Sequence, residues 1–236
     1  MDVSVMRGES HLTVSVLMAL PTTMVLFNML PSAGFNALIY VLGGLMIGSL
    51  LPDVDASDSK IMYGSWKGIG LFGKYLFYKP MTWILRKHSE AIKDEHRGYL
   101  HSLFGCLLAA LFFAIPIGII FVLTAYVWLV PFELSLLIWY VWLGIPIGFL
   151  MHLVEDGFTK SGVRWFFPRG KAYSGHASTG KKSEYNLVTA FFVTFGLLTV
   201  GAYMVAASLM TLFAVLLLSV VLVGVLFAAN RFISKI

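Results

Sequence analysis

The sequence predicts an all-α fold, a polytopic membrane helix bundle of about six transmembrane helices, and three observations support this prediction. Hydrophobic residues make up 58% of the 236 residues, and the mean hydropathy is +0.84. Only 12% of the residues are charged, whereas a soluble domain contains roughly twice that share. Four long stretches contain no Asp, Glu, Lys or Arg: residues 10–52, 98–132, 134–154 and 185–230.

The uncharged stretches divide into six spans, since a transmembrane helix needs about 20 apolar residues. The segment Pro31-Ser32-Ala33-Gly34 divides the first stretch, and a short turn near 206–208 divides the last. We expect two units: residues 1–185, a membrane-embedded core of four helices with its cytoplasmic loops, and residues 186–236, a C-terminal hairpin. The predicted spans are residues 12–30, 35–51, 99–124, 134–155, 186–205 and 209–229.

The distribution of basic residues predicts how the helices cross the membrane. With six spans, the two termini and the loops at 52–97 and 157–185 share one side. These segments contain all 17 Lys and Arg residues, and the opposite connections contain only Glu133 as a charged residue. Basic loops remain in the cytoplasm, so we expect a multi-pass protein of the inner or plasma membrane with both termini cytoplasmic. Topology thereby explains the net charge of +5, and we expect the lipid bilayer, not nucleic acid, as partner.

Seven His and Asp residues lie at the ends of predicted spans, and threading the spans in order places all seven at the cytoplasmic face. Scattered solubilising residues would not converge in this way, whereas a metal site built from helix ends would. Imidazoles and carboxylates together suit Zn²⁺, or Mn²⁺ where carboxylates dominate. Seven ligands allow two ions, and paired ions serve hydrolysis. The candidate metal ligands are His11, Asp53, Asp55, His96, His101, His152 and Asp156.

Two of the ligand motifs close predicted spans. Asp53 and Asp55 follow Pro52, which we expect to end the second span, so their carboxylates lie at the aqueous boundary. His152 and Asp156 are spaced i, i+4 and share one helix face. The alternatives are an ordinary solvated Asp-rich loop for the first motif and an interhelical hydrogen bond of His152 for the second.

A third motif opens the third span. Two helical side chains five residues apart lie about 140° apart. His96 and His101 can therefore face one site only if His96 lies in the entering loop and His101 on the first helical turn, with Gly98 allowing the bend. We expect Glu155 to be an interfacial charge. The single Cys106 lies inside a span, which excludes a disulfide framework and a Cys-based zinc site.

The loop between the second and third spans contains an amphipathic segment. Residues 71–87 mix aromatic side chains with four basic residues around Pro80, which we expect to interrupt any helix. This composition fits a piece that lies in the headgroup region of the membrane. Whether the segment only anchors the loop or also contacts a substrate stays open.

Four blocks of this sequence resemble the family of inner-membrane, metal-dependent hydrolases typified by the YdjM protein of enteric bacteria. The combination of LPDxD, HRGxxHS and HxxxDxxT is specific, and its order and spacing resemble the family from residue 10 to about 168. Two departures are Ala56, where relatives often have a polar residue, and the long insertion at 56–95. The blocks are residues 10–12, 50–55, 96–103 and 148–153, the last continuing through 156–159, 162–163 and 165–168.

The resemblance implies metal-dependent hydrolysis, with Asp55 and His101 as candidate catalytic residues. The family is distantly similar to zinc-dependent phospholipase C and single-strand nucleases, which implies a phosphoester substrate, in a lipid or another molecule, at the cytoplasmic face. Arg97, Arg164 and Arg169 could neutralise an anionic substrate. Two alternatives stay open: transport or metal handling, and a non-catalytic membrane protein in which the metal only ties helix ends together.

Overall fold

Every regular element that the structure describes is helical. The computed structural model describes residues 12–17, 34–56, 59–63, 66–88 and 98–175, and eight isolated positions between 193 and 221. This part of the chain contains no strand, and Val163 and Tyr173 form an isolated antiparallel bridge. The predicted all-α class is therefore confirmed for these residues.

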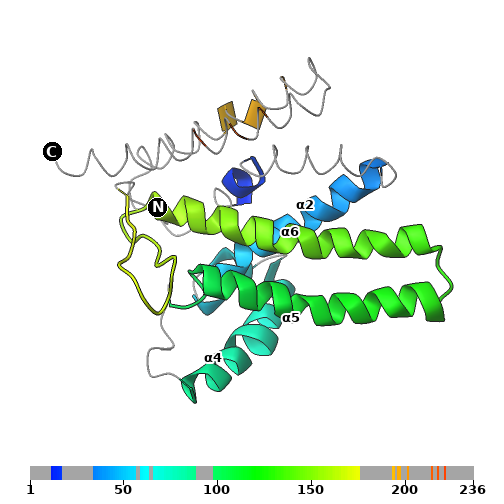
Figure 1. Cartoon of the computed structure of the whole chain (residues 1–236), viewed down its shortest axis with the longest axis horizontal. Helices are drawn as coiled ribbons and strands as arrows, with labels where there is room; N and C mark the ends of the chain where they lie inside the picture. Colours follow the sequence, from blue (N-terminus) through cyan, green and yellow to red (C-terminus); the bar gives the residue numbers. More distant parts are fainter. Residues whose placement is uncertain are drawn as a thin grey trace.

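Two long antiparallel helices, α5 (Leu103–Val122) and α6 (Phe132–Gly157), form a hairpin that runs the length of the molecule (Figure 1). A π turn, η7 (Leu123–Val127), extends α5, and Pro131 stands at the N-cap of α6. The indole N–H of Trp142 donates a hydrogen bond to the carbonyl oxygen of Ala110 at 2.8 Å. This bond ties the two helices together where their apolar side chains pack.

Three described helices are long and apolar enough to cross a membrane, namely Ala37–Asp55, Leu103–Val127 and Phe132–Gly157. They coincide with the second, third and fourth predicted spans. The outer face of α5 exposes an apolar stripe at i, i+4 spacing, in which each side chain is more than half exposed. Such a stripe is unusual on a soluble monomer and is expected where hydrocarbon chains surround a helix. The stripe consists of Leu107, Leu111, Ile115 and Ile119.

The three other predicted spans fall almost wholly outside the described residues. Of the first, at 12–30, the structure describes residues 12–17, and of those at 186–205 and 209–229 only isolated positions. The number of six spans, the C-terminal hairpin at 186–236 and the cytoplasmic location of both termini therefore stay predictions.

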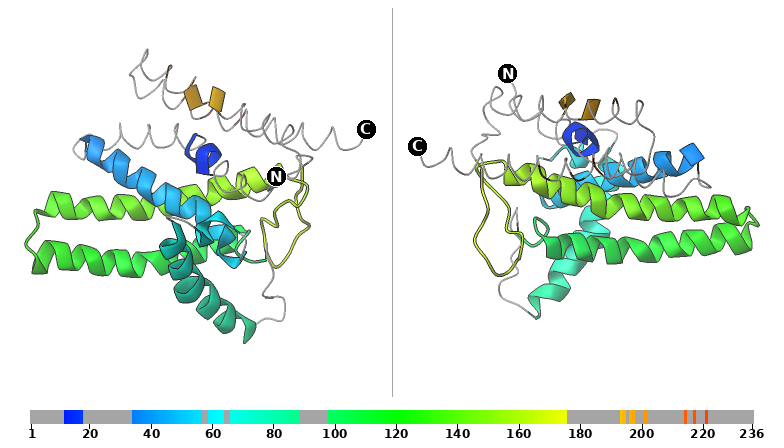
Figure 2. Two further views of the ribbon diagram at one scale, coloured as in Figure 1. Left: turned by 180° about the vertical axis from the view of Figure 1, so that it is seen from behind. Right: turned by 45° about the horizontal axis from the view of Figure 1, so that its top comes forward.

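Helix α2 (Gly34–Leu50) crosses α6 at very close range (Figures 1 and 2). A Cβ atom on Gly44 or Gly48 would collide with a backbone carbonyl of α6, and one on Gly144 or Gly148 would collide with a carbonyl of α2. Both pairs have the spacing G-x-x-x-G, which lets backbones of membrane helices approach each other. The crossing thus brings the C-terminal end of α2 against the last turns of α6.

After α2 the chain turns through a 3₁₀ helix, η3 (Leu51–Asp55), and a second short one, η4 (Lys60–Met62). Pro52 lies in the first turn of η3, as expected of a residue that cannot continue the preceding helix. Asp53 and Asp55 therefore leave α2 directly beside the end of α6.

A third helical segment diverges steeply from the hairpin (Figures 1 and 2). It comprises α3 (Lys67–Phe72), the π turn η6 (Gly73–Tyr78) and α4 (Lys79–Arg86), which follow one another without a break. The expectation that Pro80 interrupts a helix is wrong, because Pro80 lies in the first turn of α4 and the π turn before it accommodates the missing N–H. Phe77 packs on Phe112 and Phe113, with ring centroids 5.1 and 6.2 Å away.

Candidate metal centre

His152 lies near the end of α6 and is buried. Its Nδ1 atom lies 2.7 Å from the backbone carbonyl oxygen of Ser49. Because a carbonyl oxygen only accepts, a neutral His152 has its proton on Nδ1 and presents the lone pair of Nε2. That Nε2 atom lies 3.7 Å from Oδ1 of Asp53 and 3.7 Å from Oδ2 of Asp156. Since Ser49 follows Gly48 directly, the close helix crossing also fixes the tautomer of this imidazole.

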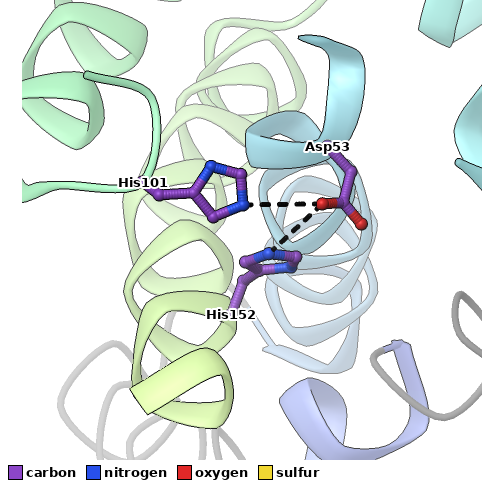
Figure 3. Close-up of side chains that lie close together, drawn as sticks. All are labelled: Asp53, His101 and His152. Carbon is purple, nitrogen blue, oxygen red and sulfur yellow. Dashed lines mark ion pairs between the residues drawn. The ribbon is translucent and has the colours of Figure 1, made fainter. Parts of the chain in front are cut away.

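His101 is fully buried, and its two ring nitrogens face different carboxylates. Nε2 lies 3.5 Å from Oδ1 of Asp53 and 3.4 Å from Oδ2 of Asp156. Nδ1 lies on the other side of the ring, 4.0 Å from Oδ2 of Asp55. Figure 3 shows His101 and His152 directed at the carboxylate of Asp53 from two different segments, with ring centroids 5.5 Å apart.

The expectation that His101 lies on the first turn of the third span is wrong. Ser102 is the N-cap of α5: its backbone is extended, and its hydroxyl oxygen accepts a hydrogen bond from the N–H of Gly105. The helix begins at Leu103, and the N–H of His101 bonds to the carbonyl of Gly98 at 3.1 Å in the preceding turn. Serine is among the preferred N-cap residues, so the helix starts several residues after the apolar stretch does.

The three carboxylates differ in their exposure. The side chains of Asp55 and Asp156 are 2% and 1% exposed, whereas that of Asp53 is 21% exposed. The cluster is thus closed on the protein side and open at Asp53. Water can approach the cluster from that side.

The donor atoms fit one divalent ion. Asp53, His101 and His152 each offer a ligand atom, and these atoms lie within 4.8 Å of one another. Oδ2 of Asp156 lies 3.4 Å from one imidazole Nε2 and 3.7 Å from the other. Ligand atoms about 2.0–2.1 Å from a tetrahedral zinc ion lie about 3.3–3.4 Å apart. The four imidazole–carboxylate separations, 3.4–3.7 Å, are close to this value.

Two predicted ligands lie outside the described residues, and two further residues near the end of α6 are buried. His11 and His96 fall outside the described residues, so their place in the cluster stays a prediction. Glu155 is only 1% exposed, so the expectation of an interfacial charge is wrong. Thr159 is buried, and its hydroxyl donates to the carbonyl of Asp156 at 2.7 Å, which fixes the end of α6.

Sequence reasoning did not anticipate Ser49 or the four glycines at the helix crossing. Nothing in the side chain of Ser49 signals its part, since it contributes its backbone carbonyl. The paired G-x-x-x-G spacing, in contrast, is a sequence signal for close packing of membrane helices, and it would have indicated that α2 and α6 are neighbours.

The comparisons with known proteins identify the family. The chain matches the family model described as YdjM inner membrane protein over residues 6–232. The chain belongs to this family. The match covers nearly the whole sequence and confirms the resemblance seen in the motifs. Comparison with curated proteins and comparison with solved structures each returned no match.

Proposed function

We propose that this YdjM family member is a metal-dependent hydrolase that acts on a phosphoester at the cytoplasmic face of the inner membrane. The supporting observation is the cluster in which Nε2 of His101 and Nε2 of His152 both face the carboxylates of Asp53 and Asp156. Ionisable groups at the boundary of a membrane helix are costly and mark functional sites.

Charge supports a divalent ion at this cluster. Two neutral imidazoles and two carboxylates carry two negative charges, which one divalent cation neutralises. A cation placed between these carboxylates and the imidazole lone pairs would offset part of the cost of burying them. When bound, a zinc or manganese ion supplies a Lewis acid that activates water and polarises a phosphoryl oxygen.

The chain's own residues then have distinct roles. Asp53 is the ligand nearest to solvent, so it borders the path by which water and substrate reach the ion. Asp55 faces Nδ1 of His101, which suits it to orient that imidazole and raise its basicity, as carboxylates beside metal-bound His residues do. Arg164 and Arg169 are exposed in the loop after α6, where they can attract an anionic substrate.

The first test measures metal content. Purified wild-type protein should contain about one zinc or manganese ion per chain among the described ligands, and a second ion if His11 and His96 contribute. The variants Asp53→Ala and His152→Ala should lose most of this metal, because each removes a ligand. His88→Ala is the matched control, since His88 is exposed and outside the cluster. Metal content unchanged in both cluster variants would refute the site.

The second test measures hydrolysis. The metal-loaded protein should cleave at least one member of a phosphoester panel that includes phospholipids, and a chelator should abolish the cleavage. A protein that binds metal normally but hydrolyses nothing in a broad panel would refute the hydrolase and favour a structural ion. Metal-dependent ion flux through the protein in liposomes would favour transport instead.

A further inference from the structure

The helical segment from α3 to α4 exposes large apolar side chains together with basic ones. Tyr75 and Leu76 are each 54% exposed and Trp83 is 62% exposed. Residues 67–88 contain five Lys and Arg residues and no Asp or Glu. A face that is both aromatic and purely basic is complementary to an anionic lipid surface.

The basic and aromatic groups of this segment contact each other in pairs. Nζ of Lys79 lies 4.7 Å from the ring centroid of Tyr75, and Nζ of Lys87 lies 3.4 Å from that of Trp83. Tyr and Trp side chains are enriched at membrane interfaces, where an apolar ring meets polar headgroups. Each pair therefore offers a ring to the acyl boundary and an ammonium group to a phosphate at the same place.

The opposite side of the segment fixes its depth relative to the spanning helices. The hydroxyl of Tyr99 donates to the carbonyl of Tyr78 at 3.2 Å and lies 3.1 Å from the hydroxyl of Thr82. Tyr99 comes four residues before α5, so α4 is level with the start of this span. At the other end of the segment, the ring centroid of Phe72 lies 6.0 Å from that of Phe113, which is about 15 Å further along α5 than its first residue. The segment thus rises from the apolar layer toward the headgroups.

We propose that residues 67–87 form a tilted helix at the membrane interface that binds the headgroups of anionic phospholipids of the surrounding bilayer. The apolar side chains enter the acyl boundary, and Lys74, Lys79, Arg86 and Lys87 bind lipid phosphates. Because Tyr99 lies two residues before His101, the bound headgroups lie beside the segment that positions the candidate metal centre. The proposal does not depend on metal binding or hydrolysis.

Spin-label accessibility tests the depth of the helix in the full-length protein reconstituted in phosphatidylglycerol–phosphatidylcholine vesicles. Single cysteines replace Trp83, Ile119 or Phe166 in a Cys106→Ala background, with folding checked by size-exclusion chromatography. Ile119 belongs to the exposed apolar stripe of α5, and Phe166 is 73% exposed in the loop after α6. We expect the label at 119 to be the most accessible to oxygen and the label at 166 to be the most accessible to an aqueous nickel chelate. The label at 83 should have intermediate accessibility to both reagents. A label at 83 as accessible to an aqueous nickel chelate as the label at 166 would overturn the proposal.

A charge-neutralised variant tests the lipid chemistry. Lys74, Lys79, Arg86 and Lys87 are replaced by Gln, and the control replaces the exposed Lys160 and Lys171 in the loop after α6, which leaves Arg164 and Arg169 in place. Each basic residue near an anionic surface strengthens binding roughly fivefold. Enrichment of phosphatidylglycerol over phosphatidylcholine around the purified protein should therefore fall at least about tenfold in the helix variant and much less in the control. Equal enrichment in wild type and helix variant, or equal losses in both variants, would contradict the proposal.

Discussion

The substitution Gly48→Ala should weaken metal binding although residue 48 is not a ligand. A Cβ atom at this position would collide with the carbonyl oxygen of Ile145. Since real Cβ atoms stay at least 3.0 Å from backbone atoms, α2 and α6 would have to separate by roughly 1 Å there. A metal site tolerates only about 0.2 Å in its ligand distances, and Asp53 and His152 lie on the two separating segments. We expect the zinc affinity to fall roughly 10- to 100-fold, and overpacking to cost about 1–3 kcal/mol of stability.

Chelator competition measures the affinity, and thermal unfolding in the same detergent measures the stability. The matched control is Gly43→Ala, because a Cβ atom at position 43 meets nothing within 4 Å. Ala also favours a helix more than Gly does, so this control should keep wild-type affinity with unchanged or slightly raised stability. If Gly48→Ala bound zinc as tightly as Gly43→Ala, the idea that the helix crossing sets the ligand geometry would be wrong.

Three further predictions concern the residues around the cluster and the topology. Asp55→Asn should lower zinc affinity roughly 10- to 100-fold without changing the metal content at saturation, because it weakens the orientation of His101; an unchanged affinity in chelator competition would exclude this role. Ser102→Ala should cost about 1 kcal/mol in thermal unfolding by removing the N-cap of α5, whereas Ser102→Thr should retain most of that stability, and equal losses would argue against capping. A reporter enzyme that is active only in the cytoplasm should be active when fused after Ile236. Activity only of a reporter that works outside the cytoplasm would refute the six-span topology.

The described spans could be predicted closely because the membrane imposes their length and polarity. The predicted span at 35–51 corresponds to Gly34–Leu50, and that at 134–155 to Phe132–Gly157. The third span was placed about four residues too early, since hydropathy alone does not distinguish apolar turn residues such as Leu100 from helical ones. Only the hydrogen bond to the Ser102 side chain defines where α5 begins.

The membership of the described ligands in one cluster was also predictable, but its internal arrangement was not. Helix periodicity places His152 and Asp156 on one face, and the order of spans brings Asp53 to the same end of the bundle. The orientation of His152 depends on a contact between distant segments, the one with the carbonyl of Ser49, and Oδ2 of Asp55 lies 4.0 Å from Nδ1 of His101. Such contacts follow from the helix crossing, which a one-dimensional pattern does not contain.

The packing of the fold and the polar cluster make opposite contributions to stability. Between membrane helices there is little hydrophobic driving force, so close glycine contacts and interhelical hydrogen bonds must hold α2 against α6. The cluster beyond that crossing adds Asp55, Asp156, His101 and His152, all buried, and replacing buried ion pairs by apolar residues is often neutral or stabilising. Stability therefore does not account for these four side chains. Their cost is understandable if the cluster binds an ion, because a cation placed between the carboxylates and the imidazole lone pairs is attracted to both.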